Sequence, residues 1–205
     1  MRKIIYIRWL FFFLGLVIFA FGISLTIRGA LLGIGPWDVL HVGLFINFGL
    51  TIGIWAIVSG LVLVLCTSLY LKQWPLIGTW LNMILVGVFI DIFLWLLPAV
   101  SNPVLQTILF IVGVAIMGVG VGMYIAANMG AGPRDTLMLI LVEKTGWTVK
   151  KVRTLLEIVV GIIGWILGGP LGVGTVIIAL TLGYLVHYTL IYFRNWILKL
   201  SELPE

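Results

Sequence analysis

A six-residue phrase occurs twice in this chain, and it restricts the possible folds more than any other feature. The first copy is Gly33-Ile-Gly-Pro-Trp-Asp38 and the second is Gly130-Ala-Gly-Pro-Arg-Asp135, 97 positions later in a sequence of 205 residues. The halves also match outside the phrase, with Gly15, Gly22 and Gly78-Thr79 aligned to Gly113, Gly120 and Gly174-Thr175. A duplicated, apolar chain is typical of transporter folds built from two structural repeats. We therefore predict two repeats, residues 1–100 and 101–205, in one integral membrane domain.

The composition indicates a membrane environment. Hydrophobic residues make up 62% of the chain and charged residues 9%, whereas soluble domains carry about 45–50% and roughly 25%. Five apolar runs are each close to the ~20 residues that cross a bilayer: Trp9–Ile27, Leu50–Leu71, Trp80–Leu97, Leu105–Ala127 and Val173–Phe193. We expect an all-α, multi-pass membrane protein. Its first run is longer than the apolar region of a signal peptide and is expected to remain uncleaved.

The net charge of +5 comes from basic residues that flank the apolar runs. They occur at Arg2, Lys3 and Arg8, at Lys144, Lys150, Lys151 and Arg153, and at Arg194 and Lys199. Cytoplasmic loops of membrane proteins are marked in this way. The distribution predicts a lipid bilayer as the partner of this chain and no nucleic acid.

Two short segments after the repeated phrase leave the topology open. Pro36–Phe48 and Pro133–Gly146 reach only about 20 Å as helices, which is short for a span. If both are re-entrant half-helices, each repeat has three transmembrane helices and the second repeat is inverted (3+3). Lys72, Arg134, the 144–153 cluster and both termini are then cytoplasmic, and Arg28 alone breaks the charge rule. If both segments span, the repeats are parallel (4+4), which fits the charges less well, so we favour the inverted arrangement.

The repeated phrase has the chemistry of a helix start. Glycine permits a tight turn, proline suits the first helical position, and aspartate at the third complements the positive helix end. A purely structural turn is one interpretation. The other is that irregular backbone within a membrane lines a cavity, where broken helices point at a substrate. The substrate-binding candidates are Gly35, Pro36, Trp37, Asp38, Gly132, Pro133, Arg134 and Asp135.

Arg134 occupies the slot that Trp37 fills in the first copy. This difference places a fixed cation, or an aromatic wall, beside a ligand. Alternatively, the long arginine side chain extends to the membrane surface. Two helix N-termini and one arginine, offset by two aspartates, favour an anionic or zwitterionic solute.

Four ionisable residues lie where lipid is expected: Asp91, His187, Glu157 and His41. Because charge is costly in a bilayer, such residues are candidates for a proton or ion relay. Glu157 has an alternative partner in Arg153 at i, i+4, and His41 has one in Asp38. Asp91 and His187 occupy equivalent places in the two repeats, where interhelical hydrogen bonding is the alternative.

Known catalytic and metal patterns are missing from the sequence. Cys66 is the single cysteine, and the glycine-rich segment 168–175 lacks the lysine of a phosphate loop. We expect no catalytic residues, no metal and no cofactor. Three functions remain: a transporter or permease for a small solute, a membrane subunit such as the solute-capturing part of an ATPase-driven importer, and, less favoured, an intramembrane enzyme.

The first span, the Gly-x-Gly-Pro-Trp-Asp turn and its second copy together resemble the bacterial YczE/YyaS/YitT-type multi-pass membrane proteins, over nearly the whole chain. The resemblance implies a bacterial plasma membrane location. The basic residues add the expectation that both termini are cytoplasmic. The resemblance itself implies no substrate, and no functional residues are carried over from the family. The sequence leaves open whether the chain forms a homo-oligomer or binds a partner membrane or ATPase subunit.

Overall fold

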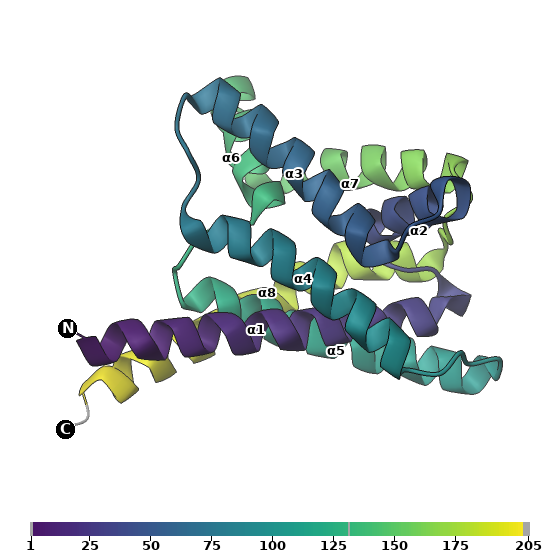
Figure 1. Cartoon of the computed structure of the whole chain (residues 1–205), viewed down its shortest axis with the longest axis horizontal. Coiled ribbons are helices and arrows are strands. Elements are labelled where there is room, and N and C mark those ends of the chain that lie inside the picture. Colours follow the sequence, from purple (N-terminus) through teal and green to yellow (C-terminus); the bar gives the residue numbers. More distant parts are fainter. Residues whose placement is uncertain (1, 131, 203–205) are drawn as a thin grey trace.

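Long apolar segments satisfy their backbone polar groups in lipid as helices, and the computed structural model contains helices and turns but no strands in the part that it describes, residues 2–130 and 132–202. This part contains eight α-helices and one 3-10 helix, η1 (Ala30–Leu32). The α-helices are α1 (Arg2–Arg28), α2 (Pro36–Phe48), α3 (Ile52–Leu71), α4 (Ile77–Leu96), α5 (Pro103–Ala126), α6 (Pro133–Thr145), α7 (Val149–Ile166) and α8 (Val173–Glu202). Figure 1 shows α1, α5 and α8 running side by side along the longest axis.

The five predicted apolar runs correspond to α1, α3, α4, α5 and α8. By length and composition, these five are the helices in the described residues that are able to cross a membrane. Side chains cap three helix starts in the expected way: Thr51 accepts from the Ile54 amide, Asn102 from those of Val104 and Leu105, and Thr148 from that of Lys151. Helix α7 has 18 residues and four charged side chains, so it is not among the five.

The short helix α2 ends at the same end of the molecule as the helix before it. At that end, the Arg28 guanidinium donates to the carbonyl of Leu94, near the end of α4. The start of α3 adjoins the end of α4 as well, since the Gly53 amide donates to Asp91 at 2.8 Å. Residue 49, directly after α2, accepts from the Trp55 indole in α3 at 2.8 Å. The chain after α1 therefore turns back into the molecule, and α2 runs outward again.

Helix α6 also begins inside the molecule, but it runs outward to the opposite end. It follows α5, begins among the other helices and ends beside the end of α3, where the Lys144 ammonium lies 5.8 Å from the centre of the Tyr70 ring. Both short helices thus start inside the molecule and leave it at opposite ends (Figure 1).

The centre of the fold is a close antiparallel crossing of α1 and α5. A Cβ on Gly15 would lie 2.5 Å from the backbone nitrogen of Tyr124, and one on Gly22 would lie 2.6 Å from that of Met117. Small residues let helices approach closely where water supplies no hydrophobic driving force. Side chains such as Phe12, Leu16 and Ile23 fill the core around this crossing.

The ends of the molecule differ in charge. Both termini lie at one end (Figure 1), together with Lys72 and the turn between α6 and α7. That turn is followed by Lys150, Lys151 and Arg153. The uncharged segment 97–102, between α4 and α5, lies at the other end.

Candidate functional site

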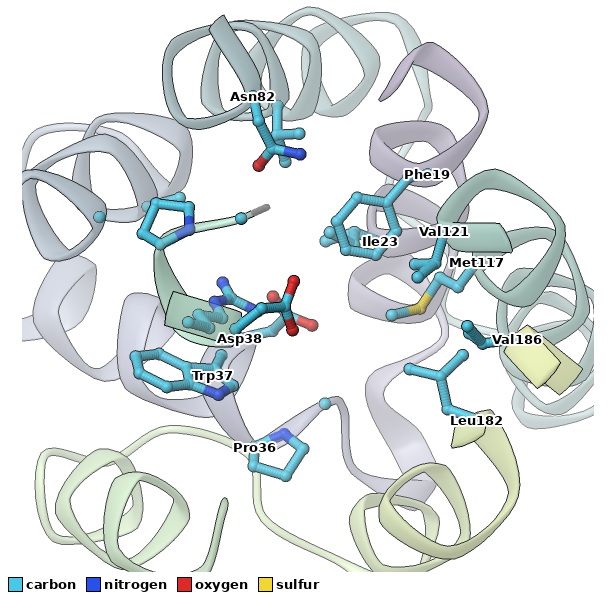
Figure 2. Close-up of a pocket in the computed structure, with 18 of the residues that line it drawn as sticks. Phe19, Ile23, Pro36, Trp37, Asp38, Asn82, Met117, Val121, Leu182 and Val186 are labelled. Carbon is cyan, nitrogen blue, oxygen red and sulfur yellow. The ribbon is translucent and has the colours of Figure 1, made fainter. Parts of the chain in front are cut away.

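A cavity of about 170 Å³ lies where the two short helices begin. All eight residues predicted from the repeated phrase border it, namely Gly35, Pro36, Trp37, Asp38, Gly132, Pro133, Arg134 and Asp135. The close-up in Figure 2 shows Trp37 and Asp38 at its edge, with Asn82 across from them. Residues that are 97 positions apart in sequence therefore share one site.

The two glycines in each copy of the phrase have different local roles. Gly33 and Gly130 have φ angles of +96° and +151°, which side chains rarely adopt. Gly35 has an ordinary φ of −57°, yet a Cβ on it would lie 2.6 Å from the Asp38 carboxylate. A Cβ on Gly132 would lie 3.2 Å from the Asp135 carboxylate. The first glycine thus makes the predicted turn, whereas the second leaves room for an acidic side chain.

Each turn contacts the start of a long helix from the other half of the chain. A Cβ on Gly33 would be 2.7 Å from the Thr175 hydroxyl at the start of α8. A Cβ on Gly130 would be 3.1 Å from the Thr79 hydroxyl at the start of α4. Because Gly78-Thr79 and Gly174-Thr175 are aligned in the sequence, the same contact occurs twice and fixes both short helices at the cavity.

Arg134 lies beside the cavity with its guanidinium 4.6 Å from the centre of the Trp37 ring. The two residues that break the symmetry of the phrase are therefore in contact, in a cation–π geometry. No carboxylate oxygen in the described part of the chain lies within 4 Å of the guanidinium. Placing Arg134 among the cytoplasmic charges was wrong, because the preceding turn directs α6 outward from the interior and leaves Arg134 at its inner end.

Two polar side chains at the cavity each have one atom without a hydrogen-bond partner among the described residues. Asp38 is 3% exposed and its Oδ1 accepts no hydrogen bond. Asn82 in α4 is 7% exposed and its Nδ2 donates none. Buried polar groups are normally paired, so the Asn82 amide is available to a ligand, whereas Asp38 Oδ1 lies 3.8 Å from His41 Nδ1. Asn82 was missed as a site residue, although its position inside an apolar run was the available signal.

The opposite wall of the cavity is apolar. It consists of side chains from α1, α5 and α8, and Figure 2 labels Phe19, Ile23, Met117, Val121, Leu182 and Val186 there. The charged and amide groups come instead from α2, α4, α6 and α7. The cavity thus has one polar and one apolar side.

The four relay candidates are not brought together. Glu157 borders the cavity and pairs with Arg153 at 3.0 Å, which was the alternative expected for it. His41 is fully buried beside Asp38. Asp91 accepts from the Thr51 hydroxyl and the Gly53 amide at the start of α3, whereas His187 is exposed on α8 against Tyr188. A relay role for Asp91 and His187 stays a prediction, at a distance from the cavity lining.

The described residues contain no group of three or more histidine, cysteine, aspartate or glutamate side chains able to hold a metal ion.

Comparison with known proteins places this architecture in a family. Residues 6–190 match a family of unknown function, DUF6198. The chain belongs to this family. It is 48% identical over 190 residues to the uncharacterized membrane protein YczE of Bacillus subtilis, covering 93% of this chain and 88% of the relative. It is 30% identical to YyaS of Bacillus subtilis over 185 residues, with 88% and 90% covered.

A third relative, an uncharacterized protein of Haemophilus influenzae, is 33% identical over 175 residues, or 84% of this chain and 77% of the relative. No solved structure matches the chain. The predicted resemblance to the YczE and YyaS proteins is confirmed. This family member is a multi-pass helical membrane protein, and large apolar side chains such as Val173, Leu180 and Ile166 lie exposed on its outer surface, as lipid contact requires.

Proposed function

We propose that this family member is a secondary transporter or permease for a small anionic or zwitterionic solute, which binds between the two short helices. The observation that carries the proposal is the cavity itself, since both copies of the phrase border it. Asp38 and Asn82, both in its lining, each carry a buried polar atom without a hydrogen-bond partner among the described residues. Ligand sites combine an apolar lining with a few placed polar groups in this way. No step in this proposal requires catalysis or a cofactor.

The arrangement of the helices supports an inverted repeat of three spans and one half-helix. Helices α1 and α5, which are equivalent in the two halves, run antiparallel. Helix α2 packs on α7, and its equivalent α6 packs on α3, which is the equivalent of α7. A 3+3 arrangement that can rock around a central site also needs α7 to span, although its charged residues exclude it from the five apolar helices. The basic end then faces the cytoplasm of a bacterial plasma membrane.

The charges around the cavity define the class of solute. Arg153 and Glu157 neutralise each other. Asp38 and Asp135 oppose Arg134 and two helix N-termini of about half a positive charge each. The sum is close to zero, which suits a zwitterion whose carboxylate meets Arg134. An engineered cavity of about 150 Å³ holds benzene, so this one fits a solute of roughly six to ten non-hydrogen atoms.

Ligand-induced stabilisation of the purified protein tests the proposal. The probes are butyrate, 4-aminobutyrate, L-alanine and L-leucine, with choline as a cationic comparison. A compound that binds only the folded state raises the melting temperature by mass action. We expect a carboxylate or zwitterion to do so. Arg134→Gln should weaken its binding roughly ten- to hundredfold, because a hydrogen bond to a charged group contributes about 1.5–3 kcal/mol.

Arg194→Gln is the matched control, since Arg194 is exposed on α8 and is not part of the cavity lining. The Arg194→Gln variant should bind the compound with the same affinity as the unmodified chain. Uptake of the same compound by vesicles that contain this chain alone separates a transporter from a subunit of a larger complex. Equal binding by the Arg134→Gln and Arg194→Gln variants would contradict the proposed site.

A further inference from the structure

A buried histidine beside the cavity has one ring nitrogen paired and the other unpaired. The His41 Nε2 lies 2.9 Å from the Ser59 hydroxyl oxygen in α3. While that hydroxyl donates its single proton to the carbonyl of Ala56, 3.1 Å away, its oxygen accepts from an Nε2–H group. The other nitrogen, Nδ1, lies 3.8 Å from Oδ1 of Asp38.

These two atoms face each other without a donor. His41 Nδ1 and Asp38 Oδ1 are both buried, and neither has a hydrogen-bond partner among the described residues. With Nε2 protonated, a neutral imidazole presents a lone pair at Nδ1, and a carboxylate presents only acceptors. Two buried acceptors that face each other are costly. One proton, on either atom, converts them into a donor and an acceptor.

The charged groups near this pair come from the helices that surround the cavity. Helix α6 contributes Arg134 and Asp135, α7 contributes the paired Arg153 and Glu157, and α5 contributes the Tyr124 hydroxyl. From α3, the group that faces the pair is the uncharged Ser59. Arg134 is the charge that acts on both Asp38 and His41.

We propose that Asp38 and His41 form a proton-binding pair that couples solute binding to one proton. This inference rests on the proposed function, since the solute carboxylate meets Arg134. When it does so, Arg134 no longer balances the Asp38 carboxylate, and the pair takes a proton from the side on which the solute entered. Proton and solute then leave together. By linkage, the protonated pair strengthens solute binding by the same factor.

The pair exists in one repeat only, which fixes the stoichiometry at one proton per chain. The position 97 residues after His41 is Met138, which cannot exchange a proton. The nearby Ser59 has its own proton committed to Ala56 and does not border the cavity. The Ser59–His41–Asp38 series therefore serves proton binding and not nucleophilic attack.

The test uses the fact that the chain has two histidines. In a His187→Gln background, ¹⁵N-histidine labelling leaves one ring to observe, that of His41. We expect its Nε2 to carry a proton throughout, and its Nδ1 signal to move toward that of a shared proton as the pH is lowered from 8 to 5. In the Asp38→Asn variant the amide donates to Nδ1, so the signal should become that of a neutral ring and stay constant with pH.

Glu143→Gln is the matched control, because it converts a carboxylate to an amide on an exposed part of α6 that does not border the cavity, and it should leave the His41 signals unchanged. Ser59→Ala is a second variant, in which loss of the acceptor should reduce the Nε2–H form. If the His41 signals are identical with and without Asp38→Asn, the proton pair does not exist. If Asp38→Asn fails to fold, Ser59→Ala decides instead, and identical His41 signals with and without that substitution would overturn the proton pair.

Coupling is measured with whichever of L-leucine, L-alanine, butyrate or 4-aminobutyrate stabilises the protein. Its Kd should rise with pH up to tenfold per unit, and Asp38→Asn should make it independent of pH. A pH-independent Kd in the unmodified chain would overturn the coupling. If none of the probes binds, the proposed function fails together with the coupling, while the histidine signals still decide whether the proton pair exists.

Discussion

The two glycines of the first copy of the phrase, Gly33 and Gly35, are required for different structural reasons, which the sequence alone did not distinguish. Gly33 combines a φ of +96° with the backbone nitrogen of Gly172, which would lie 2.5 Å from an added Cβ. For Gly35, the obstacle is the movable carboxylate of Asp38. A backbone obstacle in the left-handed region forces the fold to shift, whereas a carboxylate can rotate away.

These differences predict a ranking of alanine substitutions. Gly33→Ala should destabilise the protein most, by more than the ~1–2 kcal/mol of left-handed strain alone. Gly35→Ala should cost less and should displace Asp38, with weaker solute binding as a result. Gly183→Ala is the matched control, since an added Cβ meets nothing within 4 Å and alanine favours the helix by about 1 kcal/mol. Melting temperatures in detergent give the ranking, and equal values for Gly33→Ala and Gly183→Ala would refute it.

At the level of elements, the long apolar helices followed from the sequence, but their contacts did not. A segment that is apolar on all sides has no periodicity that marks its inner face. The sequence therefore did not predict that α4 would turn Asn82 into the cavity, or that His41 would meet Ser59 across 18 positions. The two helix starts at Pro36 and Pro133 were predictable because proline and glycine act locally.

Asp91 illustrates an element-scale effect and gives a second test. Its carboxylate accepts from the Gly53 amide at 2.8 Å and from the Thr51 hydroxyl, so it holds the start of α3 against α4. Asp91→Ala should lower stability by about 1–3 kcal/mol, because the buried Gly53 amide loses its acceptor. Asp91→Asn retains an acceptor oxygen and should cost less. His187→Ala, on the exposed face of α8, should change stability by less than about 0.5 kcal/mol. Thermal unfolding measures all three.

For the whole molecule, the sequence predicted a duplication, but it did not predict which chemical groups each copy contributes to the cavity. The shared features, the glycine turns and the helix contacts, build one cavity from two halves. The differences, Arg134 for Trp37 and Met138 for His41, place the cation and the proton pair. In the proposed transporter, a symmetric scaffold with asymmetric chemistry would let the halves rock while the ligand keeps one orientation.

The orientation of the whole molecule in the bilayer follows from its charged end and is the last prediction. Lys72 and the segment around Lys150 and Arg153 lie at one end of the fold, and Ser101 lies in the uncharged segment at the other. Since basic residues stay in the cytoplasm, Ser101 should face outward. The test introduces Ser101→Cys or Gln73→Cys on a Cys66→Ser background, and Gln73→Cys keeps the charge of Lys72. An impermeant maleimide added to intact cells should label the first variant only. Labelling of the second variant, with the first unreactive until cells are opened, would reverse the orientation, and labelling of both in intact cells would contradict the separation of the two ends.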